Sequence, residues 1–157
     1  MFQYHLELTA KASGLDIRFR KEAFAFDSIT QTKYRAVTLN EKDDANFTIL
    51  TGRMPTTKGE IAISEQYARA HHIPLGKTLR IADATFTVVA LATDAFSYFP
   101  TADPDFPVPQ TEVSAIIYGY RDTLRAISAG SSSSQADKTV TETFTFFLTN
   151  PNKKSGF

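Results

Sequence analysis

The sequence contains few groups of side chains that could carry out chemistry, and each group lacks a necessary partner. Gly76-Lys77-Thr78 matches the end of a phosphate-binding loop, but that loop needs another glycine five residues earlier and a helix after it. Here position 71 is a histidine, and the residues after Thr78 have the pattern of a strand. We therefore predict no nucleotide site and interpret Gly76 as a turn residue with positive φ.

The histidines and the acidic pairs do not predict a metal site. His71 and His72 are adjacent, so on a helix their side chains point about 100° apart and cannot face one metal together. The chain has 3 His and no Cys, which puts a four-ligand zinc site made of Cys and His out of reach. Asp43-Asp44, or Asp103 with Asp105, could bind a hard cation weakly, but solvent-exposed loop carboxylates are the more common case. No metal and no cofactor is predicted.

Nucleophilic catalysis is not predicted either. The serine run at 131–134 lacks the Gly-x-Ser-x-Gly context of a hydrolase serine. Glu60 and Asp94 are the acids that a hydrolase would use, but no pair of base and nucleophile accompanies them. We predict no catalytic residues and do not expect an enzyme.

Composition narrows the remaining classes of protein. The length of 157 residues corresponds to about one domain, and 42% hydrophobic residues with 13 Phe are enough for a core. The 17 Lys and Arg balance the 17 Asp and Glu, without the basic cluster that nucleic-acid binding requires. Apolar runs such as 88–92 are far shorter than the roughly 20 residues of a membrane span. We expect a water-exposed domain; any spans and targeting signals of a parent membrane protein would lie outside these residues.

The first half of the chain combines strands with one short helix. Residues 15–20 and 34–39 alternate with a period of about two. A turn-forming block over 51–60 precedes an apolar strand at 61–63. Ser64 is a candidate N-cap for the helix that follows it. Beyond that helix, the pattern predicts a hairpin with strands at 78–82 and 85–92, joined by Asp83-Ala84.

The second half is dominated by a loop and by two further strands. Residues 94–112 include four Pro within ten residues, which precludes regular structure. A buried strand is predicted at 113–118 and another strand at 139–148. A serine-rich connector at 130–134 separates the last strand from the residues before it.

These elements predict an α+β fold of mixed or antiparallel sheet with two short helices, near 64–72 and 121–129. We expect a single domain over 1–157. Its possible subdomains are 1–50 plus 113–150, and 51–112.

The central third of the chain resembles a known family. The residues that carry the resemblance are Gly52-Arg53-Met54-Pro55, Gly59-Glu60-Ile61-Ala62-Ile63-Ser64, Ala68, Ile73-Pro74-Leu75-Gly76-Lys77-Thr78-Leu79 and Phe86-Thr87-Val88-Val89-Ala90. Their order is similar to that in the extracytoplasmic domain of MacB/FtsX-type ABC-transporter permeases. Two positions depart from that pattern: Lys77 stands where the family usually has Asp, and Ala90 where it usually has Gly. The second departure predicts an ordinary strand rather than a bulge at Ala90.

Each motif residue also has a local interpretation. Gly52 and Gly59 permit turns on either side of Pro55, and Arg53 can hold the turn by bonding to carbonyls or to Glu60. Gly76, the remaining motif residue, turns the chain from helix to strand.

The resemblance implies a MacB-like periplasmic core domain on the extracytoplasmic face of the cell membrane. Such a domain is inserted between two spans of a permease, is not an enzyme, and works with an ATPase that is a separate cytoplasmic subunit or domain. It contacts the permease helices and, outside the membrane, a protein, peptide or substrate. Because both ends of an insert return to one membrane, the two ends of the chain should lie on one side of the domain. Residues 2–9 and 139–148 would then form neighbouring strands or a shared stalk.

The aromatic residues of the 94–112 loop are the predicted contact with a partner or substrate. Phe96, Tyr98, Phe99 and Phe106 are many aromatics for one loop, and the prolines lower the entropy cost of holding it ready. The alternative for these rings is a lid that packs on the core. The alternative function for the whole chain is a stand-alone extracellular domain that binds a small molecule or a peptide under this loop.

Overall fold

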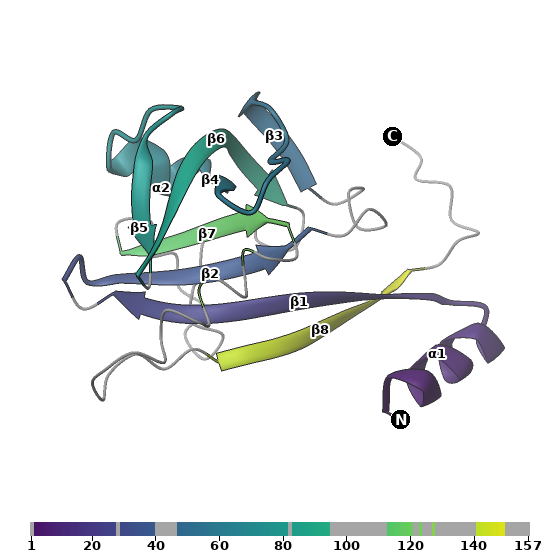
Figure 1. Cartoon of the computed structure of the whole chain (residues 1–157). Helices are drawn as coiled ribbons and strands as arrows, with labels where there is room; N and C mark the ends of the chain where they lie inside the picture. The colour runs from purple at the N-terminus through teal and green to yellow at the C-terminus, as the bar shows by residue number, and fades with distance from the viewer. Residues whose placement is uncertain are drawn as a thin grey trace.

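A computed structural model describes residues 2–27, 29–39, 47–81, 83–94, 113–120, 123, 127 and 141–149 of the chain. Within these residues, one sheet dominates, and α1 and α2 flank it (Figure 1). The elements are α1 (Phe2–Ala12), β1 (Asp16–Asp27), β2 (Thr32–Thr38), β3 (Phe47–Gly52), β4 (Glu60–Ser64), α2 (Glu65–Ala70), β5 (Thr78–Ile81), β6 (Ala84–Asp94), β7 (Ser114–Gly119) and β8 (Thr141–Thr149).

The sheet is mixed. Seven strands follow the order β3-β6-β4-β7-β2-β1-β8, and β5 pairs with the first part of β6. The pairs β2–β7 and β4–β6 are parallel, and the other pairs are antiparallel. In Figure 1, β8, β1, β2 and β7 cross the lower half of the molecule, while β3 to β6 and α2 lie above them. The predicted α+β class with a mixed sheet is therefore confirmed.

The centre of the sheet explains the pattern of β7. This strand lies between β4 and β2, and all six of its residues are buried. Its side chains alternate between two apolar clusters, with Ala115 and Ile117 in one and Ile116 and Tyr118 in the other. A continuous apolar run is what a strand covered on both faces requires, so the predicted buried strand at 113–118 is confirmed.

Residues 2–9, expected to form a strand or part of a stalk, lie in the helix α1, so the strand alternative was wrong. Gly14 ends this helix with φ +68. Its N–H donates to the carbonyl of Lys11 at 3.1 Å, and the N–H of Leu15 donates to the carbonyl of Ala10 at 2.9 Å. These two bonds form the usual C-terminal cap that a glycine in the left-handed conformation allows.

Most of the other predicted elements are found in the structure. The strands at 15–20, 34–39, 61–63 and 139–148 lie within or overlap β1, β2, β4 and β8, and α2 occupies most of 64–72. The predicted hairpin is formed by β5 and β6, but its two-residue loop is 82–83, one position earlier than expected. Of the predicted helix at 121–129, only Thr123 and Ile127 are described, and both are helical and buried. Residues 95–112 lie outside the described part of the chain.

The two ends of the described chain meet at one end of the sheet. In the antiparallel pair of β1 and β8, Asp16 at the start of β1 lies opposite Thr149 at the end of β8. Figure 1 shows α1 beside this same end of the sheet. The described chain therefore has the arrangement expected from the sequence, with both ends on one side, although one of them is a helix. In the part of the chain that the structure describes, no helix has the length and apolarity needed to cross a membrane.

A buried ion pair joins β1 to β2. The side chain of Glu22 is 2% exposed and that of Arg35 is 16% exposed. The guanidinium donates to both carboxylate oxygens, with Nη2 at 2.7 Å from Oε1 and Nε at 3.1 Å from Oε2. It also lies 5.8 Å from the ring centre of Phe24. Such a pair fixes the position of the two strands because neither charge can be left alone in the interior.

We expect Arg35→Met to lower the free energy of unfolding by about 3–5 kcal/mol, because it removes the guanidinium from a buried carboxylate. Urea unfolding of the 157-residue chain measures this. The matched control is Arg69→Met, since Arg69 pairs with Glu65 but its side chain is 81% exposed; its loss should be below about 1 kcal/mol. Equal small losses in both variants would show that Glu22 does not depend on Arg35.

Candidate functional site

The motif residues between β3 and β4 form one cross-linked turn. Arg53 Nη1 donates to Glu60 Oε2 at 2.9 Å and to the carbonyl of Met54 at 3.1 Å, and its Nη2 pairs with Glu60 Oε1. The backbone N–H and the hydroxyl of Thr56 donate to the same Glu60 Oε2, at 2.9 and 3.0 Å. The enclosed Pro55 is buried. The expectation that Arg53 holds this turn through carbonyls or Glu60 is confirmed.

A close approach between two backbones ties this turn to β6. Gly52 has φ +94, and a Cβ there would lie 2.2 Å from the carbonyl oxygen of Val89. The same oxygen accepts the N–H of Arg53 at 3.1 Å. Val89 is an extra residue in β6, because Ile61 of β4 pairs with Val88 and the next residue, Ala62, pairs with Ala90. The strand is therefore bulged beside Ala90, and the prediction of an ordinary strand there was wrong.

The other two motif glycines have different roles. Gly76 has φ +84, as predicted, and its N–H donates to the carbonyl of Val88 at 2.7 Å. Gly59 has no positive φ, and a Cβ there would meet no atom within 4 Å. Gly59 lies in a turn, as expected, but the conformation of this turn does not require a glycine. Its carbonyl accepts the N–H of Thr87 at 2.8 Å, a bond that any residue could make.

The turn also changes the acidity of its carboxylate. The hydrogen bond from Arg53 and the backbone hydrogen bond from Thr56 lower the pKa of Glu60 from 4.5 to about 2. The hydrogen bond to Glu60 raises the pKa of Arg53. The side chain of Glu60 is 17% exposed and that of Arg53 is 57% exposed. Glu60 is therefore a charged structural residue that stays ionised in neutral solution, not a proton donor for catalysis.

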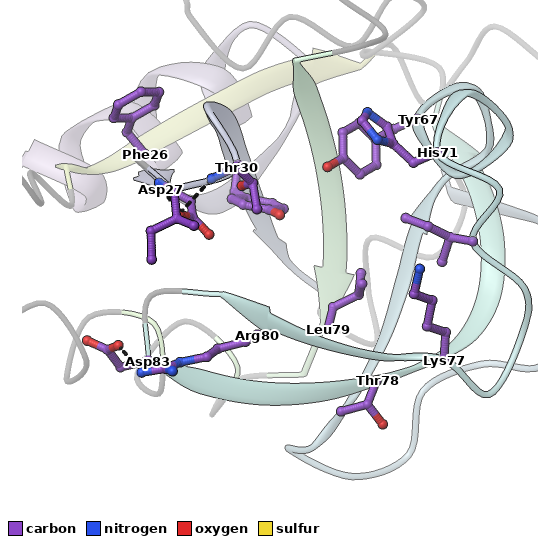
Figure 2. A pocket seen from close by; sticks show the side chains of 13 residues that line it. Phe26, Asp27, Thr30, Tyr67, His71, Lys77, Thr78, Leu79, Arg80 and Asp83 are labelled. Carbon is purple, nitrogen blue, oxygen red and sulfur yellow. Dashed lines mark hydrogen bonds and ion pairs between the residues drawn. The ribbon is translucent and has the colours of Figure 1, made fainter.

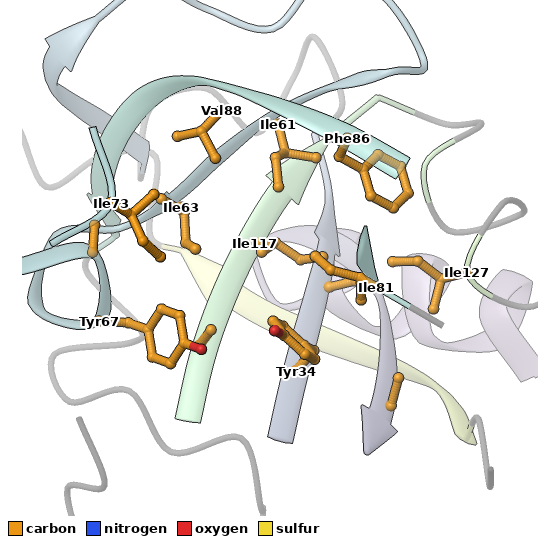
Figure 3. Packing of buried hydrophobic residues seen from close by; sticks show 14 of the residues in the cluster. Tyr34, Ile61, Ile63, Tyr67, Ile73, Ile81, Phe86, Val88, Ile117 and Ile127 are labelled. Atoms are coloured by element: carbon orange, nitrogen blue, oxygen red, sulfur yellow. The ribbon is translucent and has the colours of Figure 1, made fainter. Parts of the chain in front are cut away.

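A cleft of about 440 Å³ opens on another face of the domain. One wall is the β1–β2 turn with Ile29 and Thr30, the other is the segment from Lys77 to Asp83, and Tyr67 and His71 lie at one end (Figure 2). Its floor is the edge of the larger core cluster, where Tyr34 and Tyr67 point inward from β2 and α2 (Figure 3). Sequence reasoning missed this cleft because its walls come from separate segments, each ordinary when taken alone.

Polar contacts on the floor of the cleft are internal. The hydroxyls of Thr32 and Tyr67 lie 3.2 Å apart, and the rings of Tyr34 and Tyr67 meet edge to face at 6.4 Å. Burial, with a further contribution from the neighbouring Tyr67, raises the pKa of Tyr34 far above its ordinary value. The Tyr34 side chain on the floor of the cleft is therefore uncharged at neutral pH. The ring of His71 packs on Tyr67 with centres 4.2 Å apart.

The remaining candidates from the sequence are the Gly-Lys-Thr segment, Ser64 and the aromatic residues of the 94–112 loop. Gly76-Lys77-Thr78 leads into β5 rather than a helix, so it does not have the form of a phosphate-binding loop. Ser64 precedes α2 but makes no side-chain cap; its hydroxyl accepts the N–H of Ile116 in β7 at 3.2 Å. The aromatic residues of the predicted contact loop lie outside the described residues: Phe96, Tyr98, Phe99 and Phe106. The described residues contain no group of three or more His, Asp or Glu that could hold a metal ion.

Comparison with known proteins identifies no family for this chain. No protein-family model matches the chain, and no curated protein matches it. The resemblance in the central block is therefore a hypothesis that depends on the motif residues themselves.

We expect Gly52→Ala to destabilise the domain strongly. The left-handed conformation alone costs a residue with a side chain about 1–3 kcal/mol, and the new methyl group would also collide with the Val89 carbonyl. Gly59→Ala is the matched control: with open space and no positive φ, it should be neutral or stabilise by about 0.4–1 kcal/mol. Urea unfolding compares the two variants. Similar losses in both would contradict the role assigned to the Gly52–Val89 approach.

The acidity of Glu60 gives a second prediction. A carboxyl whose pKa is lower in the folded protein adds stability above its unfolded pKa, and this stability is lost as pH falls from 4.5 to about 2. An NMR titration of the Glu60 carboxyl should have its midpoint near pH 2, and Arg53→Gln should move the midpoint up towards 4.5. Arg80→Gln removes an arginine from a different turn and should leave it unchanged. An unchanged midpoint in Arg53→Gln would exclude Arg53 as the main cause.

Proposed function

We propose that the chain is a non-catalytic, extracytoplasmic domain of an ABC-transporter permease of the MacB/FtsX type. In this role it lies at the outer face of the cell membrane, contacts the permease helices, and binds a partner protein, peptide or substrate. It relays the motion that a cytoplasmic ATPase subunit or domain drives. It needs no cofactor of its own.

The observation that supports this proposal is that two motif segments, Gly52-Arg53 and Gly76-Lys77, contact a third motif segment at one point of β6. Gly52-Arg53 contacts the carbonyl of Val89, while Gly76-Lys77 exchanges two backbone hydrogen bonds with Val88, at 2.7 and 2.9 Å. These segments lie up to 37 positions apart, from 52 to 89, and each belongs to the pattern that resembles the permease family. A chance match of short motifs gives no reason for such convergence, whereas an inherited structural unit does.

The path of the chain also suits an insertion between two membrane spans. The start of β1 and the end of β8 lie side by side, so both connections leave the sheet at the same end. The helix α1 leads into β1 there and can serve as the stalk that sequence reasoning assigned to this segment. We propose that the loop aromatics Phe96, Tyr98, Phe99 and Phe106 provide the contact with the partner, as their composition suggests.

A second candidate function is a stand-alone extracellular binding domain. The 440 Å³ cleft favours it, since ligand pockets are commonly between about 300 and 1,000 Å³. The two candidates differ in what surrounds the domain in the full-length gene product, because only the permease needs spans on both sides.

We therefore expect the full-length gene product to contain an apolar segment of about 20 residues on each side of this domain. Lys58→Cys tests its location, because Lys58 is exposed and the chain has no other cysteine. A membrane-impermeant maleimide should label this variant in intact spheroplasts. The control is a cysteine in the cytoplasmic ATPase, which should be labelled only after permeabilisation. Absence of flanking spans, or labelling of Lys58→Cys only after permeabilisation, would contradict the proposal.

A further inference from the structure

The cleft between the two hairpins exposes apolar side chains in a fixed arrangement. Ile29 at the tip of the β1–β2 turn is 91% exposed, and its neighbour Phe26 is 36% exposed. A single exposed apolar residue is ordinary on a protein surface, but these two line the same cleft. Leu79 lines the opposite wall and is only partly buried. The two walls therefore offer an apolar slot to a ligand.

Both walls are held in place before any ligand binds. Asp27 Oδ1 accepts the N–H of Ile29 at 2.9 Å and of Thr30 at 3.3 Å, which fixes the turn that carries Ile29. Across the cleft, Arg80 Nη2 pairs with Asp83 Oδ1 at 2.7 Å at the tip of the hairpin. A ligand would find its site already formed, so little of its binding energy would go into ordering the protein.

The charges in the cleft are unevenly placed. Figure 2 shows Asp27, Arg80 and Asp83 towards one end, and Lys77 and His71 towards the other. Each carboxylate already accepts hydrogen bonds from the protein, as described above. Lys77 has no carboxylate partner among the residues that the structure describes, and its side chain extends towards the end where His71 lies. One end of the cleft therefore presents a cation that is available to an anion.

We propose that this cleft binds an apolar monocarboxylate, with the carboxylate at Lys77 and the apolar body between Ile29 and Leu79. The class includes the free C-terminus of an apolar peptide and a short aromatic or aliphatic acid. The uncharged tyrosine floor adds no negative charge that would repel the ligand. The inference does not rest on the proposed permease function.

The experiment is calorimetric titration of the 157-residue chain with two matched pairs of probes. The first pair is 4-phenylbutyrate and its neutral amide; the second is N-acetyl-Leu-Phe with a free carboxylate and the same dipeptide as its amide. We expect each acid that binds to do so at least about tenfold more tightly than its amide, as a charge-assisted hydrogen bond allows. Binding of the dipeptide acid alone would identify peptide C-termini as the ligand, and binding of phenylbutyrate would identify small acids.

Three variants assign the binding to this cleft. Lys77→Gln should remove the preference for the acid, and Ile29→Ser should weaken acid and amide alike by about fivefold, through lost apolar contact. Lys58→Gln, an exposed lysine outside the cleft, is the control and should bind as the parent chain does. Lys77 and Ile29 are exposed, so thermal unfolding should show both variants folded. No saturable binding of either acid, equal binding of acid and amide, or an unchanged preference in Lys77→Gln would overturn the proposal.

Discussion

The upper half of the domain depends on one constraint: β6 must accept three partner strands although a strand has only two edges. It does so because β5 and β3 share one edge, with β5 paired to Ala84–Thr87 and β3 paired to Ala90–Asp94. The opposite edge pairs with β4. At the point where one partner gives way to the next, the chain carries the bulge at Val89. Bulges bend and twist a strand locally, which lets it serve two partners on one edge.

Two glycines with positive φ, one from each of the segments that share this edge, contact the bulge. Gly52 ends β3 and Gly76 precedes β5, and their backbones contact Val89 and Val88 respectively. The close approach at Gly52 excludes a side chain there, whereas at Gly76 only the positive φ favours glycine, since a Cβ would meet no atom within 4 Å. The turn held by Arg53 and Glu60 starts at Gly52 and ends where Glu60 pairs with Thr87, and the excursion through α2 returns to the junction at Gly76. The position of the cleft wall from Lys77 onwards is therefore fixed by Gly76, the residue just before it.

Sequence patterns predicted the parts of the fold that local residues decide. The apolar run of β7 and the β5–β6 hairpin were recognisable because burial and turn chemistry act over a few residues. Helix α1 was missed although Gly14 with Lys11 in the preceding turn is a usual helix-end signal. The bulge at Val89 was missed because it arises from the spacing of partners on both edges, which no single segment records. The cleft was missed for the same reason, since its walls meet only through tertiary contacts.

Lys77 shows how a turn can keep its shape while its chemistry changes. The family that the chain resembles usually has Asp at this position, yet the turn forms here with Lys. It does so because the bonds that close it come from the backbone, between Val88 and the Gly76 N–H and the Lys77 carbonyl. The side chain of Lys77 takes no part in them and is exposed. The backbone therefore fixes the position of this residue, while its side chain decides the charge that position 77 adds to the cleft. Lys at this position gives that end of the cleft a positive charge, whereas Asp would give it a negative one.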